Sequence, residues 1–255
     1  NLYTMLDTTM LGIMSGNVAV GYYTNSMKLV KMIITAIAAV GGALLPRLSY
    51  YHINGMEDEC SNIVNIVFKI MLMIFIPCAV GVFLTADLIM PVMFGESFVP
   101  AGGTLKILSF LIWTLGFSNL FGTQVLLTYG QEKRLLICTV IGAISNVLMN
   151  LVLIPRFEQN GAAIASVISE TLVTIITYVY ANKFIRISID WKYARDIICA
   201  LISMVIFVKI IMAIEMNIYI GLVLAVVIGI ISYLIVWILL GRKEIKLIIE
   251  EVREK

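Results

Sequence analysis

Charged side chains are scarce in this chain of 255 residues, because only 13% are Asp, Glu, Lys or Arg whereas 61% are hydrophobic. A soluble domain is about half apolar and about a quarter charged, so this composition excludes an ordinary soluble protein. The net charge of +2 is too small to indicate a nucleic-acid partner. The mean hydropathy of +1.01 instead predicts an all-α, polytopic helical membrane protein.

Histidine and cysteine are also scarce, and their placement excludes common catalytic and metal-binding arrangements. His52 is the only histidine. The cysteines Cys60, Cys78, Cys138 and Cys199 have neither zinc nor redox spacing. No glycine-rich loop followed by Lys and Ser or Thr is present, so nothing in the sequence binds a nucleotide. We therefore expect no metal, no cofactor and no enzyme activity.

Long hydrophobic runs are abundant and predict a series of membrane helices joined by short loops. The expected helices cover residues 2–14, 21–48, 63–84, 104–129, 135–154, 161–181, 194–214 and 218–240, and an amphipathic charged tail follows at 241–255. The first run is shorter than the roughly 20 residues that cross a bilayer. The chain also begins at Asn1 without a basic leader. We therefore expect it to start inside a helix, with an N-terminal half missing.

The basic residues outside these runs predict the orientation of the chain. If the loop after Leu48 lies in the cytoplasm, nearly all of them fall on the cytoplasmic side and Arg156 alone falls outside. This asymmetry follows the positive-inside rule. It predicts a multi-pass protein of the cell membrane, the cytoplasmic membrane of a bacterium, whose C-terminus is cytoplasmic.

The run 21–48 is the most informative stretch, because Lys28 and Lys31 lie deep within it. In a helix these lysines form one polar stripe with Thr24 and Thr35. A lysine near the middle of a membrane costs roughly 2.5–3.5 kcal/mol, so two lysines on one face should meet protein or water. We interpret the stripe as the cationic wall of an aqueous cavity that binds substrate. The alternative is that each lysine extends to the interface without a specific role.

Two carboxylates in the apolar runs are candidates for ion coupling. Asp7 lies in the first helix and could take up a proton or a sodium ion, or pair with Lys28. Glu170 lies about nine residues into its helix, roughly 14 Å deep at about 1.5 Å per residue. A lone carboxylate at that depth needs a partner or a proton. Glu170 therefore either takes part in transport or fixes helix packing by a buried hydrogen bond.

Four amide side chains in the spans are candidate polar residues of the cavity. Asn146 and Asn150 lie one helical turn apart, and an ordinary role in hydrogen bonding between helices explains them equally well. Asn119 and Gln124 face partly different sides of their helix and are weaker candidates.

The order and spacing of several short motifs resemble the Wzx-type flippases, which move lipid-linked oligosaccharides and belong to the multidrug/oligosaccharidyl-lipid/polysaccharide exporter superfamily. The resemblance covers essentially the whole chain, although each motif alone is weak. It is carried by Asp7 with Met10–Gly12, Gly21–Tyr23, Lys28–Leu29, Pro46–Ser49, Phe94–Gly95, Phe98, Ala101, Leu105, Ile107–Leu108, Asn146, Asn150, Leu153–Pro155 and Gly161–Ser166.

The resemblance implies a fold of fourteen helices in two bundles around a central cavity. Residues 1–184 would form the second bundle, and residues 185–255 the final helix pair with its cytoplasmic tail, together about helices 7–14. The N-terminal half of the same chain would then be an essential partner, alongside membrane lipid. Glu158 departs from the pattern, because the family usually has Gly there.

The resemblance also implies the function. We expect a flippase that moves an undecaprenyl-pyrophosphate-linked oligosaccharide across the membrane by alternating access, driven by a proton or sodium gradient, for cell-surface polysaccharide synthesis. A multidrug cation antiporter of the same superfamily is one alternative, but it would need carboxylates rather than lysines in its cavity. A membrane-embedded glycosyltransferase or acyltransferase is a weaker one, because such enzymes need acid/base or metal-binding groups.

Overall fold

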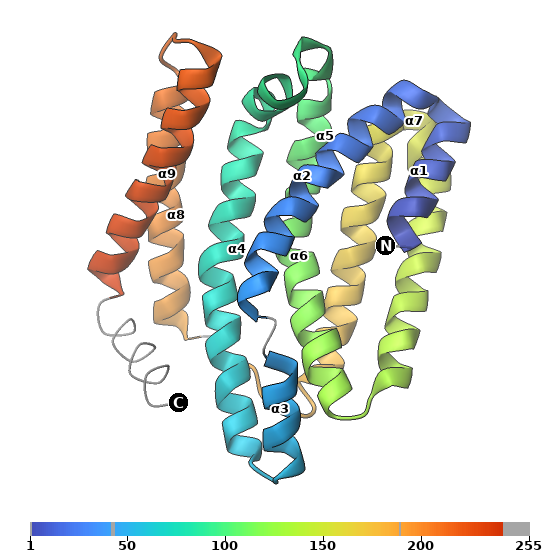
Figure 1. The fold of residues 1–255 in the computed structure, drawn as a ribbon, viewed down its shortest axis with the longest axis vertical. Coiled ribbons are helices and arrows are strands. Elements are labelled where there is room, and N and C mark those ends of the chain that lie inside the picture. Colours follow the sequence, from blue (N-terminus) through green and yellow to red (C-terminus); the bar gives the residue numbers. More distant parts are fainter. Residues whose placement is uncertain (1, 42–43, 189, 242–255) are drawn as a thin grey trace.

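The computed structural model describes residues 2–41, 44–188 and 190–241, and within these ranges every regular element is helical. The elements are α1 (Leu2–Ser15), α2 (Asn17–Gly41), α3 (Leu44–Ile53), α4 (Glu57–Phe94), η1 (Glu96–Phe98), α5 (Ala101–Leu108), α6 (Leu111–Ser118), η2 (Asn119–Leu126), α7 (Glu132–Ala181), α8 (Trp191–Met212) and α9 (Ile218–Leu240). Most of them run side by side along the long axis of the molecule (Figure 1). The all-α class predicted from composition is confirmed.

Four stretches of the described residues are long and apolar enough to cross a membrane: α4, residues 101–126, α7 and α9. The chain is therefore a multi-pass helical membrane protein. The tail predicted at 241–255 lies outside the described residues from position 242 onward. The division at residues 184 and 185 stays a prediction.

The lysine-bearing helix differs from its predicted bounds. Residues 21–48 were expected to form one helix, but α2 begins at Asn17 and ends at Gly41, and α3 begins at Leu44. Residues 42 and 43, between these two helices, lie outside the described residues, so one uninterrupted helix over 21–48 stays a prediction.

The predicted helix at 104–129 is also not uniform. It divides into α5, α6 and the π-helix η2, and the break between α5 and α6 falls at Ser109–Phe110. Gly116 in α6 lies directly beneath the ring of Phe75, because a methyl group on Gly116 would lie 2.1 Å from a carbon of that ring. A π-helix shifts the hydrogen-bonding register by one residue, and π-helical segments are frequent at functional sites.

Residues 135–154 and 161–181 form the two halves of α7, which meet at Glu158. Glu158 has φ 50° and ψ −126°, a left-handed conformation that strongly favours glycine. This geometry explains why glycine is usual at this position in the resembling family. The halves lie side by side (Figure 1), and a methyl group on Gly161 would lie 2.3 Å from the carbonyl oxygen of Leu153.

The final helix pair, α8 and α9, packs against α4. The hydroxyl of Tyr233 on α9 donates a hydrogen bond to the carbonyl oxygen of Met73, at 3.0 Å. That carbonyl has no intrahelical donor, because the residue four positions later is Pro77, which lacks an N–H group. Tyr193 on α8 donates likewise to the carbonyl oxygen of Lys69, at 2.8 Å. One stripe of α4 therefore holds both helices.

The connection between α7 and α8 is attached to the same stripe. The amide of Asn65 donates to the carbonyl oxygen of Arg186 at 3.0 Å, and its oxygen accepts from the backbone N–H of Ser188 at 2.9 Å. Asn182 accepts from the N–H of Ile187 at 3.0 Å. This segment is held by side chains at both its start and its middle.

Candidate functional site

Asp7 lies at the centre of a buried polar cluster and is only 1% exposed. Its Oδ2 accepts hydrogen bonds from the hydroxyls of Tyr23, at 2.6 Å, and Ser166, at 2.7 Å. Its Oδ1 accepts one from Nδ2 of Asn150, also at 2.6 Å. The same nitrogen lies 3.2 Å from Oδ1 of Asn146. We call these five residues the Asp7 cluster.

The Asp7 cluster joins three helices that are distant in the sequence. Asp7 comes from α1, Tyr23 from α2, and Asn150 and Ser166 from the two halves of α7. The turn at Glu158 brings these halves together, because it reverses the chain midway between the last two residues. The fold thus places a carboxylate, two hydroxyls and two amides where no single helix could.

Two polar atoms of the cluster are buried without a hydrogen-bond partner: Oδ1 of Asn150 and Nδ2 of Asn146. A buried polar group without a partner costs about 1–3 kcal/mol, so such a group in a native protein calls for an explanation. Carboxylate, amide and hydroxyl oxygens are ligands suited to a small hard cation. The oxygens around Asp7 are therefore of a kind that binds a small hard cation, and Asn150 Oδ1 is one that no hydrogen bond uses.

The cluster differs from the structural alternative predicted for Asp7. No ion pair between Asp7 and Lys28 is found among the described residues, and the Nζ of Lys28 lies 3.5 Å from Oδ1 of Asn25. Lys31 interacts electrostatically with Asp7 over a longer range. The prediction that Asp7 pairs with Lys28 is therefore wrong, and its carboxylate oxygens instead accept hydrogen bonds from Tyr23, Ser166 and Asn150.

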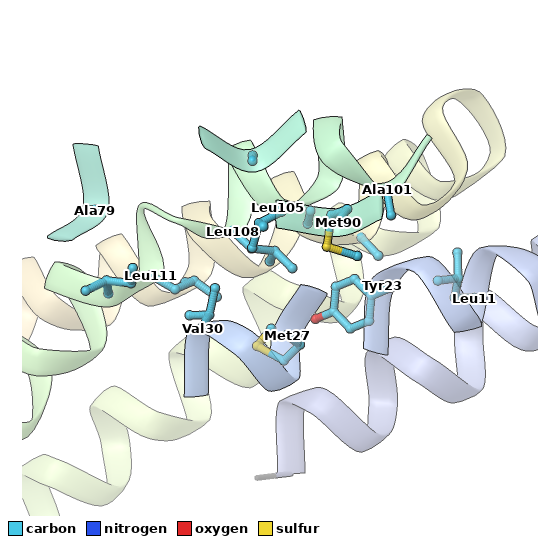
Figure 2. Packing of buried hydrophobic residues seen from close by; sticks show 14 of the residues in the cluster. Leu11, Tyr23, Met27, Val30, Ala79, Met90, Ala101, Leu105, Leu108 and Leu111 are labelled. Carbon is cyan, nitrogen blue, oxygen red and sulfur yellow. The ribbon is translucent and has the colours of Figure 1, made fainter. Parts of the chain in front are cut away.

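One side of α2 is buried in the core. Tyr23, Met27 and Val30 are buried and project into the core toward Met90 and Leu108 (Figure 2). A small residue allows α2 to pack closely on α5. Ser26 is fully buried between these helices, with its hydroxyl 3.5 Å from the carbonyl oxygen of Ala101.

The predicted polar stripe lies beside the buried side of α2. Lys28 and Thr35 are exposed, and Thr24 and Lys31 are half-buried. Both threonine hydroxyls donate to carbonyl oxygens one turn earlier in the helix. The two lysines are therefore the charged groups of this stripe, and Lys28 is the more exposed of the two.

Glu170 is buried at 7% exposure, and its carboxyl group lies near Ser118 of α6. It lies one turn beyond Ser166 on α7, so its axial offset from the Asp7 cluster is about 6 Å. No side-chain hydrogen bond from Glu170 to the cluster is found among the described residues. Its role in transport and its role in helix packing both stay predictions.

The amide candidates separate into two groups. Asn146 and Asn150 are fully buried beside Asp7 rather than exposed on an open surface. Asn119 is exposed and Gln124 half-buried, and both lie in the π-helix, where Nε2 of Gln124 lies 3.4 Å from Oδ1 of Asn119. The sequence grouped all four as polar residues of a cavity, but the structure brings only the first pair to Asp7.

Two members of the Asp7 cluster were missed by sequence reasoning. Tyr23 is one of many aromatic residues in an apolar run, and Ser166 ends the Gly161–Ser166 motif. Neither residue type is unusual in a membrane helix. A usable signal existed for Ser166, because Asn150 and Ser166 lie on opposite sides of a predicted turn and thus on facing helices.

A second polar cluster lies where α3, α4 and the segment after η2 meet. Nδ1 of His52 lies 2.7 Å from Oε1 of Glu57, and the hydroxyl of Tyr129 donates to Oε2 of the same carboxylate. The rings of His52 and Tyr129 are 4.3 Å apart. Burial and the bond to Glu57 raise the pKa of Tyr129, so its hydroxyl remains a donor. His52 is thus a structural contact of α3, and no three His, Cys, Asp or Glu residues lie together as a metal site in the described ranges.

Comparison with known proteins finds three relatives whose names describe membrane proteins or transporters. The chain is 25% identical over 209 residues to the "Probable low-salt glycan biosynthesis flippase Agl15" of Haloferax volcanii, which covers 80% of this chain and 42% of the relative. It is 28% identical over 208 residues to an uncharacterized membrane protein of Methanocaldococcus jannaschii, with 80% and 41% coverage. It is 24% identical over 196 residues to the "Putative O-antigen transporter" of Escherichia coli, with 72% and 45% coverage. The chain therefore spans less than half the length of these relatives.

A solved structure described as "Lipid II flippase MurJ, inward closed conformation" has the same fold. It superposes with a TM-score of 0.78 at 16% identity, covering 95% of this chain and 53% of that chain. The family profile "Lipid II flippase MurJ" matches residues 2–223, most of the sequence. The narrower assignments, to the Wzx type and to the C-terminal half of a fourteen-helix protein, stay predictions. This chain belongs to the lipid II flippase MurJ family.

Proposed function

We propose that the protein carrying this chain moves an undecaprenyl-pyrophosphate-linked oligosaccharide across the cell membrane by alternating access. Family membership and the names of the relatives, which refer to glycan biosynthesis and to O-antigen, support this substrate class. We further propose that residues 1–184 are the second of two bundles, that residues 185–255 form a final helix pair with a cytoplasmic tail, and that an N-terminal half completes the cavity. The product would serve cell-surface polysaccharide synthesis.

The observation that carries this proposal is the pair of lysines on one side of α2, away from its buried side. Lys28 is exposed and Lys31 half-buried, while Tyr23, Met27 and Val30 of the same helix are packed into the core. Two unit charges about 4 Å apart attract by about 4 kcal/mol at an effective dielectric constant of about 20. A pyrophosphate group between these lysines would therefore be attracted strongly, whereas a cationic drug would be repelled.

We propose sodium as the coupling ion and the Asp7 cluster as its site. Asp7, Asn150 and Ser166 would hold the ion, whose charge offsets that of the buried carboxylate. The unpartnered Oδ1 of Asn150 would give the ion a further oxygen ligand. The cluster joins α1 and α2 to both halves of α7, so a change in its charge acts on all three helices.

The test is transport by the complete protein in liposomes, with an undecaprenyl-pyrophosphate oligosaccharide labelled by a fluorophore on the sugar. An impermeant quencher then reports how much substrate has crossed the bilayer. We expect the double variant Lys28→Ala/Lys31→Ala to lower the rate at least about tenfold, since each tenfold corresponds to about 1.4 kcal/mol. Lys28→Arg/Lys31→Arg should retain most of the rate, because it keeps both charges.

The matched control is Lys209→Ala, which removes an exposed lysine from α8. It should transport at the wild-type rate. The proposal is wrong if the double alanine variant also transports normally. Loss of cationic dye efflux with normal flipping would instead favour the multidrug antiporter.

A further inference from the structure

Tyr23 is the one member of the Asp7 cluster that α2 contributes. Its side chain is fully buried, and its hydroxyl reaches Oδ2 of Asp7 at 2.6 Å and Oγ of Ser166 at 3.0 Å. Its ring packs in the same core as Leu11 and Met27, and Figure 2 shows these side chains together. The ring thus fixes α2 in the core, while the hydroxyl joins α2 to a charged group.

The same helix carries the lysine stripe. Lys28 follows Tyr23 by five residues and Lys31 by eight, which are about 7.5 and 12 Å along a helix that rises about 1.5 Å per residue. A shift of α2 at Tyr23 therefore displaces both ammonium groups. The buried hydroxyl of Tyr23 is thus a point at which the helix that carries the lysines is bonded directly to the carboxylate.

We infer that Tyr23 is a positioning residue that couples cation binding at Asp7 to the placement of Lys28 and Lys31. This inference rests on the proposed function, because it takes the Asp7 cluster as the coupling site. The Tyr23 hydroxyl and a bound cation compete for the negative charge on Oδ2. A hydrogen bond to a charged acceptor is roughly twice as strong as one to a neutral acceptor, so neutralising Asp7 weakens the hold on α2.

Coupling of this kind is reciprocal. If cation binding loosens the bond between Tyr23 and Asp7, removing that bond must make cation binding easier. Tyr23→Phe keeps the ring in the core and deletes only the hydroxyl. It should therefore bind the cation more tightly and lose the link to α2, a combination that a purely structural residue would not give.

Tyr22→Phe is the matched control. Tyr22 is the neighbouring residue of α2, and its hydroxyl donates to the carbonyl oxygen of Ser97 at 3.1 Å, away from the Asp7 cluster. The two variants each lose one tyrosine hydroxyl and one hydrogen bond from the same helix. Only the Tyr23 variant loses a contact with the carboxylate.

Two measurements on the complete protein in detergent test the inference, with NaCl varied against choline chloride at constant ionic strength. The first is the NaCl concentration that gives half of the thermal stabilisation. The second is the rate at which a maleimide labels a cysteine placed at Met32, which is 72% exposed on α2, in a background with the native cysteines replaced by serine. Asp7→Asn reports whether the response to sodium arises at Asp7.

We expect Tyr23→Phe to lower the half-saturating NaCl concentration about tenfold and to abolish the effect of sodium on labelling at position 32. Tyr22→Phe should change neither. If Tyr23→Phe behaves like Tyr22→Phe while Asp7→Asn abolishes the sodium response, the coupling role of Tyr23 is wrong and the site stands. If Asp7→Asn keeps the sodium response, the proposed site itself is wrong, and this inference with it. If Tyr23→Phe fails to fold, the protein that keeps Tyr23 still gives a test. Equal labelling rates at position 32 in sodium and in choline would then show that the coupling is absent.

Discussion

Replacing Tyr233 by Phe removes one hydroxyl group from α9 and keeps the packing of its ring. In the native fold that hydroxyl donates to the carbonyl oxygen of Met73 in α4, at 3.0 Å. Pro77 has no N–H group, so the helix itself offers this carbonyl no donor. The substitution therefore leaves a carbonyl group without a partner inside a membrane helix bundle.

The expected cost follows from these contacts. Leaving a buried acceptor unsatisfied costs about 1–3 kcal/mol, and hydrogen bonds between membrane helices measure about 0.6 kcal/mol on average and about 1.7 at most. We expect Tyr233→Phe to cost about 1.5 kcal/mol, since no alternative donor is present in the helix. At about 2–4 °C per kcal/mol for a chain of this size, the melting temperature should fall by about 3–6 °C.

A double-mutant cycle with Pro77→Ala isolates this bond. An alanine at position 77 would supply the missing N–H to the Met73 carbonyl, so Tyr233→Phe should cost no more than about 0.5 kcal/mol in that background. Thermal unfolding of the complete protein in detergent measures all four members of the cycle. Tyr193→Phe is the control, because its acceptor, the Lys69 carbonyl, already lies opposite the N–H of Met73 in the α-helical pattern.

A coupling energy near zero between positions 233 and 77 would contradict this explanation of the Tyr233 hydrogen bond. It would mean that the hydroxyl of Tyr233 does not replace the donor that proline removes. A cost for Tyr193→Phe larger than that for Tyr233→Phe would contradict the same argument.

Two further predictions concern the turn within α7. Glu158→Gly should raise the free energy of unfolding by about 1 kcal/mol. The left-handed conformation costs a glutamate roughly 1–2 kcal/mol, which exceeds the entropic cost of the more flexible glycine. An unchanged or lower melting temperature would contradict this prediction. Gly161→Ala should destabilise the protein by at least about 3 kcal/mol, since its methyl group would lie 2.3 Å from the Leu153 carbonyl oxygen. Gly103→Ala should be tolerated, because its methyl group would lie 3.8 Å from Asn160. Equal yields of folded protein from the two variants would contradict this prediction.

Most of the helical segments could be predicted from the sequence, although several of their bounds and the division of residues 104–129 could not. Hydrophobic runs report which segments avoid water, and the spacing of Lys28 and Lys31 determines which side of a helix they share. Both depend on residues close together in the chain. The exposed and half-buried positions along α2 follow that spacing.

The Asp7 cluster was not predictable in the same way. Asp7 lies 143 residues from Asn150 and 159 from Ser166, so their contact depends on how three helices pack rather than on any local pattern. The turn at Glu158 could be located but not its conformation, since a left-handed glutamate is rare.

The most direct test of the central claim is the accessibility of position 31 to water and to substrate. A cysteine placed at Lys31 in the complete protein, in membranes and without the native cysteines, is treated with a charged thiol reagent. We expect the reagent to label this cysteine rapidly. An undecaprenyl-pyrophosphate oligosaccharide should protect the cysteine, whereas undecaprenol, which lacks the pyrophosphate and the sugar, should not. A cysteine placed at Ile230, an exposed apolar position on α9, is the slow-labelling reference. If position 31 is labelled as slowly as position 230 and the oligosaccharide has no effect, the proposed cavity site is wrong.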